Sequence, residues 1–63
     1  MIEIVETTDR IRLHFLQSVL RDAGVQAFVF DGGSPWPGAI PARLMVPEAD
    51  EDLARRLIGQ AEA

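Results

Sequence analysis

The chain has 63 residues, with ten acidic side chains, six arginines, no lysine, no cysteine and a formal net charge of −4. The absence of cysteine excludes disulfides and thiolate metal sites, and an acidic chain without a basic stripe repels nucleic-acid phosphates. No apolar segment approaches the roughly 20 residues of a membrane span, and no signal peptide is recognisable. We therefore expect a single domain over residues 1–63, cytoplasmic, with no membrane or nucleic-acid partner.

Residues 1–6 predict a first strand because they are rich in β-branched side chains. Asp9 is the expected N-cap of the helix that follows, and Gly24 is its expected end, since glycine reaches positive φ without a Cβ penalty. Arg12 falls near the middle of the apolar face of this helix, where we expect its stem to pack and its guanidinium to reach solvent; a partner contact is the alternative. The apolar face is predicted to consist of Ile11, Phe15, Leu16, Val19, Leu20 and Ala23, with Leu13 at its edge.

Residues 25–30 predict a second strand that is apolar on both faces. Val25, Ala27 and Val29 alternate with Gln26, Phe28 and Phe30. A half-solvated strand normally alternates apolar with polar side chains, so this pattern is typical of a strand covered on both faces.

Residues 31–42 form a long connection in which three glycines and three prolines exclude regular structure. Loops of this length in a small domain are usually functional or mobile. Its single tryptophan, Trp36, lies between two prolines and is interpreted either as a lid on the core or dimer seam, or as an anchor for a partner.

A third strand is expected over residues 43–46 and ends at Pro47. The acidic residues 48–52 are typical of a helix N-terminus, and Asp50 is the expected cap. The second helix is predicted to bury Leu53, Leu57 and Ile58, flanked by Ala54 and Ala61.

The expected fold class is α+β: a β-α-β-β-α unit with a three-stranded sheet of order 1-3-2 and both helices on one face, a ferredoxin-like sandwich lacking its last strand. One sheet face and the free edge of the first strand are then uncovered. We expect Phe28 and Phe30 to point outward, because the smaller alternate residues let the helices approach. An exposed patch of this kind favours a homodimer.

The sequence of residues 16–29 and 43–50, around the helix end at Gly24 and the strand end at Pro47, resembles the putative prokaryotic signal-transducing protein family. The members of this family are small bacterial domains that are grouped with PII-like, ferredoxin-like proteins. The resemblance covers nearly the whole chain, and it implies that loop 31–42 stands where PII-like proteins engage partners. Its anchors are structural, so it implies no catalytic or ligand residue.

No constellation of reactive side chains is recognisable, and we expect no enzyme activity, cofactor or metal. His14 is the only histidine, and the acids of residues 48–52 lack the spacing of a calcium loop. Ser18 and Ser34 have no base besides His14, and residues 31–34 lack the lysine of a phosphate loop.

The expected function is therefore a non-enzymatic interaction or regulatory module, a homodimer that uses loop 31–42 to contact another protein. The alternative is a sensor that binds an apolar small molecule near the loop and the dimer seam. The candidate interface or ligand-contact residues are Phe28, Phe30, Trp36, Arg12, Arg43 and Met45.

Overall fold

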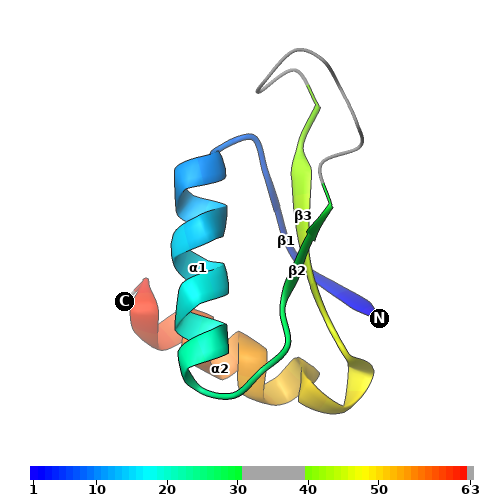
Figure 1. The fold of residues 1–63 in the computed structure, drawn as a ribbon, viewed down its shortest axis with the longest axis vertical. Coiled ribbons are helices and arrows are strands. Elements are labelled where there is room, and N and C mark those ends of the chain that lie inside the picture. The colour runs from blue at the N-terminus through cyan, green and yellow to red at the C-terminus, as the bar shows by residue number, and fades with distance from the viewer. Residues whose placement is uncertain (31–39, 63) are drawn as a thin grey trace.

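The computed structural model describes residues 1–30 and 40–62, which form two layers, a sheet and a pair of helices (Figure 1). The sheet has the order β1-β3-β2, and β3 runs antiparallel to both of its neighbours. The predicted α+β class, element order and strand order are thus confirmed. In chain order the elements are β1 (Ile2–Thr7), α1 (Arg10–Asp22), β2 (Phe28–Phe30), β3 (Ala42–Val46), the short 3-10 helix η1 (Glu48–Asp50) and α2 (Glu51–Ala61).

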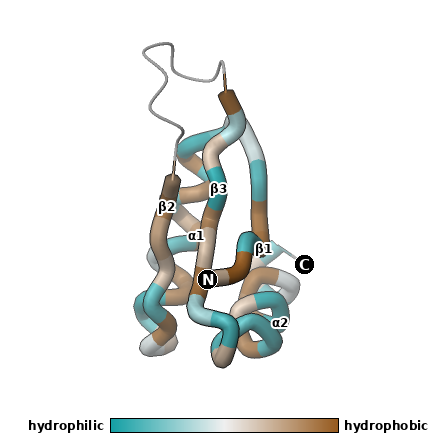
Figure 2. Tube along the Cα trace, turned by 90° about the vertical axis from the view of Figure 1, so that its right-hand side faces the viewer, coloured by the Kyte–Doolittle hydropathy of each residue, from teal (hydrophilic) through white to brown (hydrophobic). Residues whose placement is uncertain are grey.

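Both helices contribute to one core on one face of the sheet. Strand β3 and the segment before β2 supply alanines, valines and one leucine to this core, and the helices supply three leucines, one alanine and one isoleucine. In Figure 2 the three strands lie side by side with α1 behind them, so the opposite face of the sheet is the one in view. The buried residues are Leu13, Leu16, Leu20, Val25, Ala27, Ala42, Leu44, Val46, Ala54 and Ile58.

The two ends of α1 form as the sequence predicts. Asp9 accepts a hydrogen bond from the backbone N–H of Arg12 at 3.0 Å. At the other end Gly24 has φ +84°, its N–H donates to the carbonyl of Arg21, and the N–H of Val25 donates to that of Leu20. This pair of bonds is the Schellman motif, which turns the chain sharply from the helix toward the sheet.

The buried stripe of α1 differs from the predicted one. Leu13, expected at the edge, lies at its centre with Leu16 and Leu20, whereas Ile11 is 84% exposed and Phe15 is 53% exposed. The spacing 13-16-20 places the three leucines on one narrow arc, and residue 11 falls nearly opposite that arc at 3.6 residues per turn. Ala23 is exposed as well.

Strand β2 is shorter than predicted, because residues 25–27 do not pair with β3. The register that places Phe28 opposite Met45 would place Gln26 opposite Pro47. Proline has no N–H to donate, and the Pro47 carbonyl accepts from Asp50 at 2.9 Å instead. The backbone of residues 25–27 bonds to α1: Val25 to the Leu20 carbonyl, and the Ala27 carbonyl to the Gln17 side chain at 2.9 Å.

The second helix also departs in detail from its prediction. Ala54 and Ile58 are buried, Leu57 and Ala61 are partly buried, and Leu53 is exposed, which contradicts its expected place in the core. Asp50 stands at the N-cap position, but its side chain makes no capping hydrogen bond. The chain enters α2 directly from η1, so the backbone there is already helical when α2 begins.

Candidate interaction surface

The face of the sheet that the helices leave bare carries six side chains, which we call the outer sheet surface. Their placement follows from the register, because residues directly opposite each other on neighbouring strands point to the same face. Met45 lies between Glu3 and Phe28, and Arg43 lies between Glu6 and Phe30. The outer sheet surface therefore consists of two rows: Glu3, Met45 and Phe28, then Glu6, Arg43 and Phe30.

A β-bulge brings the two glutamates to the same face. Glu3 and Glu6 are three residues apart, and in a regular strand they would point to opposite faces. The register between β1 and β3 shifts between Glu3 and Val5, which inserts one extra residue, Ile4. This shift could not be read from the sequence, which is why the glutamates were not among the expected surface residues.

The β2 side of this surface is apolar and open to solvent. Phe28 is 40% exposed and Phe30 is 51% exposed, while Met45 beside Phe28 is half-buried. Val29, which alternates with the phenylalanines, packs against the core. The predicted outward orientation of Phe28 and Phe30 is confirmed, and hydrophobic colouring follows β2 in Figure 2.

The β1 side of the surface is charged and internally paired. The Nε atom of Arg43 lies 3.3 Å from Glu3 Oε1 and 3.4 Å from Glu6 Oε2. All three side chains are about half exposed, so these pairs contribute little to stability by themselves. Both pairs direct the Arg43 side chain from the central strand toward β1.

The expected site residues thus divide into three groups. Phe28, Phe30, Arg43 and Met45 lie together on the outer sheet surface. Arg12 lies in the other layer, on α1. Trp36, and with it residues 31–39 of the expected contact loop, lies outside the described residues.

Arg12 joins the start of α1 to the end of α2. Its Nε and Nη2 atoms donate to Glu62 Oε2 and Oε1 at 2.7 and 2.8 Å, a bidentate ion pair. The hydrogen bond from Arg12 holds the pKa of Glu62 below its usual value, and Glu62 raises the pKa of Arg12. Arg12 is a positive charge at the N-terminus of α1, and Glu62 is a negative charge at the C-terminus of α2. The helix macrodipole disfavours both charges at these ends, and the ion pair neutralises them. Arg12 therefore has an intramolecular partner.

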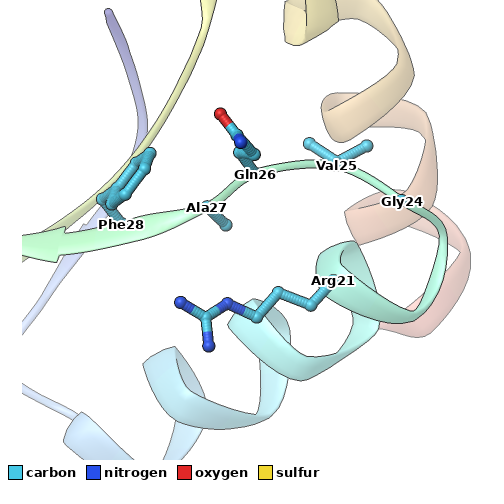
Figure 3. A pocket seen from close by; sticks show the side chains of 6 residues that line it. All are labelled: Arg21, Gly24, Val25, Gln26, Ala27 and Phe28. Atoms are coloured by element: carbon cyan, nitrogen blue, oxygen red, sulfur yellow. The ribbon is translucent and has the colours of Figure 1, made fainter.

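A hollow of about 320 Å³ lies beside the outer sheet surface, where the chain leaves α1 and enters β2 (Figure 3). Arg21 of α1 extends beneath residues 26 and 27, and Phe28 stands at one end. The sensor hypothesis needs an apolar pocket shared by Phe28, Phe30 and Trp36; of the two phenylalanines, only Phe28 lines this hollow, and Trp36 lies outside the described residues. Sequence reasoning did not select Arg21, because nothing in its spacing distinguishes it from a solvated helix residue. The lining residues are Arg21, Gly24, Val25, Gln26, Ala27 and Phe28.

Reactive groups are sparse in the described part of the chain. His14 and Ser18 are exposed on α1, and within residues 1–30 and 40–62 no three His, Asp or Glu side chains converge as metal ligands do. Among the helices described, neither has the length and apolar character needed to cross a membrane.

Comparison with models of protein families gives a match. A family model described as "Putative prokaryotic signal transducing protein" matches residues 1–62. Searches of curated proteins and of solved structures give no significant match.

Proposed function

Given that the chain belongs to the family of putative prokaryotic signal transducing proteins, we propose that it is a non-enzymatic signalling module that works as a homodimer through its outer sheet surface. The observation that carries the proposal is the pair of exposed phenylalanines on a sheet face that no described helix covers. Monomeric soluble proteins rarely expose such side chains together, and exposed apolar clusters commonly mark interaction sites.

The composition of the surface favours a second copy as the occupant. A two-fold interface presents the same patch from both sides, so apolar residues must meet apolar residues and acids must meet a base. The outer sheet surface offers both: Phe28, Phe30 and Met45 along one side, and Arg43 between Glu3 and Glu6 along the other. In a face-to-face dimer the phenylalanines supply the buried centre, and Arg43 with the glutamates sets the relative orientation.

The test compares two phenylalanines of equal exposure on opposite layers. Phe30 on the sheet is 51% exposed and Phe15 on α1 is 53% exposed. A change to aspartate therefore removes a similar buried apolar area from the monomer at either position. We expect Phe30→Asp to convert a dimer into a folded monomer and Phe15→Asp to leave the dimer intact. Light scattering at high micromolar concentration gives the mass, and circular dichroism confirms that both variants remain folded.

Two results would reject this proposal. A parent protein that is strictly monomeric at high micromolar concentration removes the homodimer altogether. A dimer that dissociates with Phe15→Asp and persists with Phe30→Asp places the interface on the helical layer. His14→Ala is the neutral control, because His14 is exposed on α1, away from the sheet.

A further inference from the structure

The outer sheet surface has an apolar side and a charged side, and the boundary between them runs parallel to the strands. Phe28 and Phe30 lie on β2, at one edge of the sheet. Glu3 and Glu6 lie on β1, at the opposite edge, and Arg43 of the central strand reaches toward them. When two such surfaces pack face to face, the direction of the two-fold axis decides which side meets which.

The axis of a face-to-face dimer lies between the two sheets, either parallel to the strands or across them. A parallel axis centred on β3 places β1 of one copy over β2 of the other, so that glutamates meet phenylalanines. Burying a charge against an apolar side chain is costly. A parallel axis centred on β2 joins the phenylalanines but leaves β1 outside the contact. An axis across the strands places every strand over its own copy, so apolar side meets apolar side over the full width of the sheet.

With the axis across the strands, the register of the sheet determines which residues face each other. Each strand then runs opposite to its copy, so the first row of one surface faces the second row of the other. Phe28 faces Phe30 of the second copy. Glu3 faces Glu6 of the second copy, with Arg43 of that copy beside it. The two charged clusters, each with two acids and one base, therefore come together.

Arg43 is the side chain that can make this contact between the clusters favourable. Its contacts with Glu3 Oε1 and Glu6 Oε2, at 3.3 and 3.4 Å, are both made at Nε. A guanidinium carries further N–H donors on both of its Nη atoms, arranged in one plane that suits carboxylates. All three side chains are about half exposed, so the cluster is accessible to a second copy of the chain.

We propose that Arg43 pairs with glutamates of both copies, across a two-fold axis that lies across the strands, and that this cluster selects a second copy of the chain as the partner. This arrangement rests on the proposed homodimer, to which it adds the orientation and the residues that recognise the second copy. Exposed ion pairs contribute little within one chain, whereas close charge pairs across an interface can contribute more and reject partners with like charges.

The experiment reverses the charges of the cluster in two separate variants. Arg43→Glu raises the number of acids in the cluster from two to three, and Glu3→Arg/Glu6→Arg raises the number of bases from one to three. We expect each variant alone to self-associate about tenfold more weakly than the parent, because like charges meet across the axis. An equimolar mixture should form heterodimers, since acids then meet bases. Light scattering at high micromolar concentration gives the masses, and circular dichroism confirms folding.

Glu51 and Arg55 of α2 provide the matched control. They form an exposed ion pair on the helical layer, with Arg55 Nη2 3.0 Å from Glu51 Oε2. Glu51→Arg and Arg55→Glu should each dimerise as the parent does, alone and mixed. A variant of the cluster that does not fold is replaced by its milder counterpart, Arg43→Gln or Glu3→Gln/Glu6→Gln. The mixture of these two should again associate more strongly than either variant alone.

Three outcomes would overturn this arrangement and leave the homodimer intact. Cluster variants that dimerise as the parent does show that the charged sides do not meet. A mixture of folded variants that stays monomeric shows that Arg43 pairs only within its own chain. Control variants that respond as the cluster variants do show a general effect of charge. A parent that is strictly monomeric rejects the homodimer itself, and the arrangement with it.

Discussion

Gly24 and Gly59 are two glycines on which the same substitution should have opposite effects. Gly24 turns the chain out of α1 with φ +84°, a conformation that strains any residue with a Cβ atom, whereas Gly59 lies inside α2 with ordinary helical backbone. A Cβ atom added at either position meets nothing within 4 Å. The difference between them is therefore purely conformational.

We expect Gly24→Ala to lower the free energy of unfolding by about 1 kcal/mol and Gly59→Ala to raise it by about 0.5–1 kcal/mol. Urea denaturation of the two variants measures both values against the parent. Equal destabilisation by the two variants would show that steric crowding, not backbone conformation, governs these sites.

Asp9 and Asp50 form a second matched pair, because both precede a helix and only one caps it. The Asp9 carboxylate accepts from the Arg12 N–H, and Asp50 makes no such bond. Asp9→Ala should therefore cost about 1 kcal/mol of stability, while Asp50→Ala should cost only a few tenths, from the lost charge near the helix start. Chemical denaturation at neutral pH distinguishes the two, and an equal cost would mean that charge matters more than the cap.

At the scale of elements, Gln17 connects α1 to the segment that enters β2. Its amide donates to the Ala27 carbonyl at 2.9 Å in a part-buried position. Gln17→Leu should lower stability by about 1 kcal/mol, since it leaves that carbonyl without its partner. Gln60→Leu on α2 is the control, because Gln60 is exposed. Thermal unfolding of both variants checks this, and a Gln17 variant as stable as the control would show that water replaces the bond without cost.

The ion pair between Arg12 and Glu62 makes the contact between the two helices depend on pH. The folded state lowers the pKa of Glu62, so its contribution is complete above the unfolded value of about 4.3 and is lost as the pH falls through the lower folded value. Glu62→Gln should therefore be less stable than the parent at pH 7, and the difference should close in acid. Urea midpoints between pH 7 and pH 2.5 measure it, with Glu48→Gln, an exposed acid, as control. A constant difference across this range would mean that packing, not charge, is lost.

The sequence predicted where the elements begin and end more reliably than it predicted which way they face. Asp9, Gly24 and Pro47 act through local backbone chemistry, and all three mark boundaries in the structure. The rotation of α1 about its axis is different, because apolar side chains occupy more than one side of the helix. Docking against the sheet selected the three leucines and left Ile11 in solvent, a choice that depends on residues far away in the chain.

The candidate surface shows the same division. Alternation along residues 25–30 was enough to place Phe28 and Phe30 on one face, and their size was enough to predict that this face points outward. The bulge at Ile4 was not predictable, since it arises from pairing between two distant segments, β1 and β3. The sequence therefore revealed the apolar half of the surface and its one arginine, Arg43, and missed the two glutamates that pair with it.

At the scale of the whole molecule, apolar residues that lie on the outer sheet surface do not contribute to the core of this small domain. A 63-residue domain buries a smaller fraction of its surface than a larger one, and it has no disulfide to restrict the unfolded state. Phe15, Phe28 and Phe30, the three phenylalanines of the chain, are all exposed, so much of the surface of the largest apolar side chains in the described residues stays in solvent in the isolated fold. In a homodimer the two on the sheet become buried, and association then adds to the stability of the fold.

This linkage between association and folding can be measured without a structure of the dimer. If unfolding separates the two chains, the thermal midpoint must rise with protein concentration, because mass action favours the associated folded state. We expect the parent midpoint to rise by several degrees over a roughly hundredfold range of concentration, as a small unfolding entropy makes the midpoint sensitive to modest free energies. Phe30→Asp should have a lower midpoint that does not change over the same range, while Phe15→Asp should keep the parent's dependence. A parent midpoint independent of concentration would show that the fold is stable without a partner, and that the exposed phenylalanines serve some purpose other than self-association.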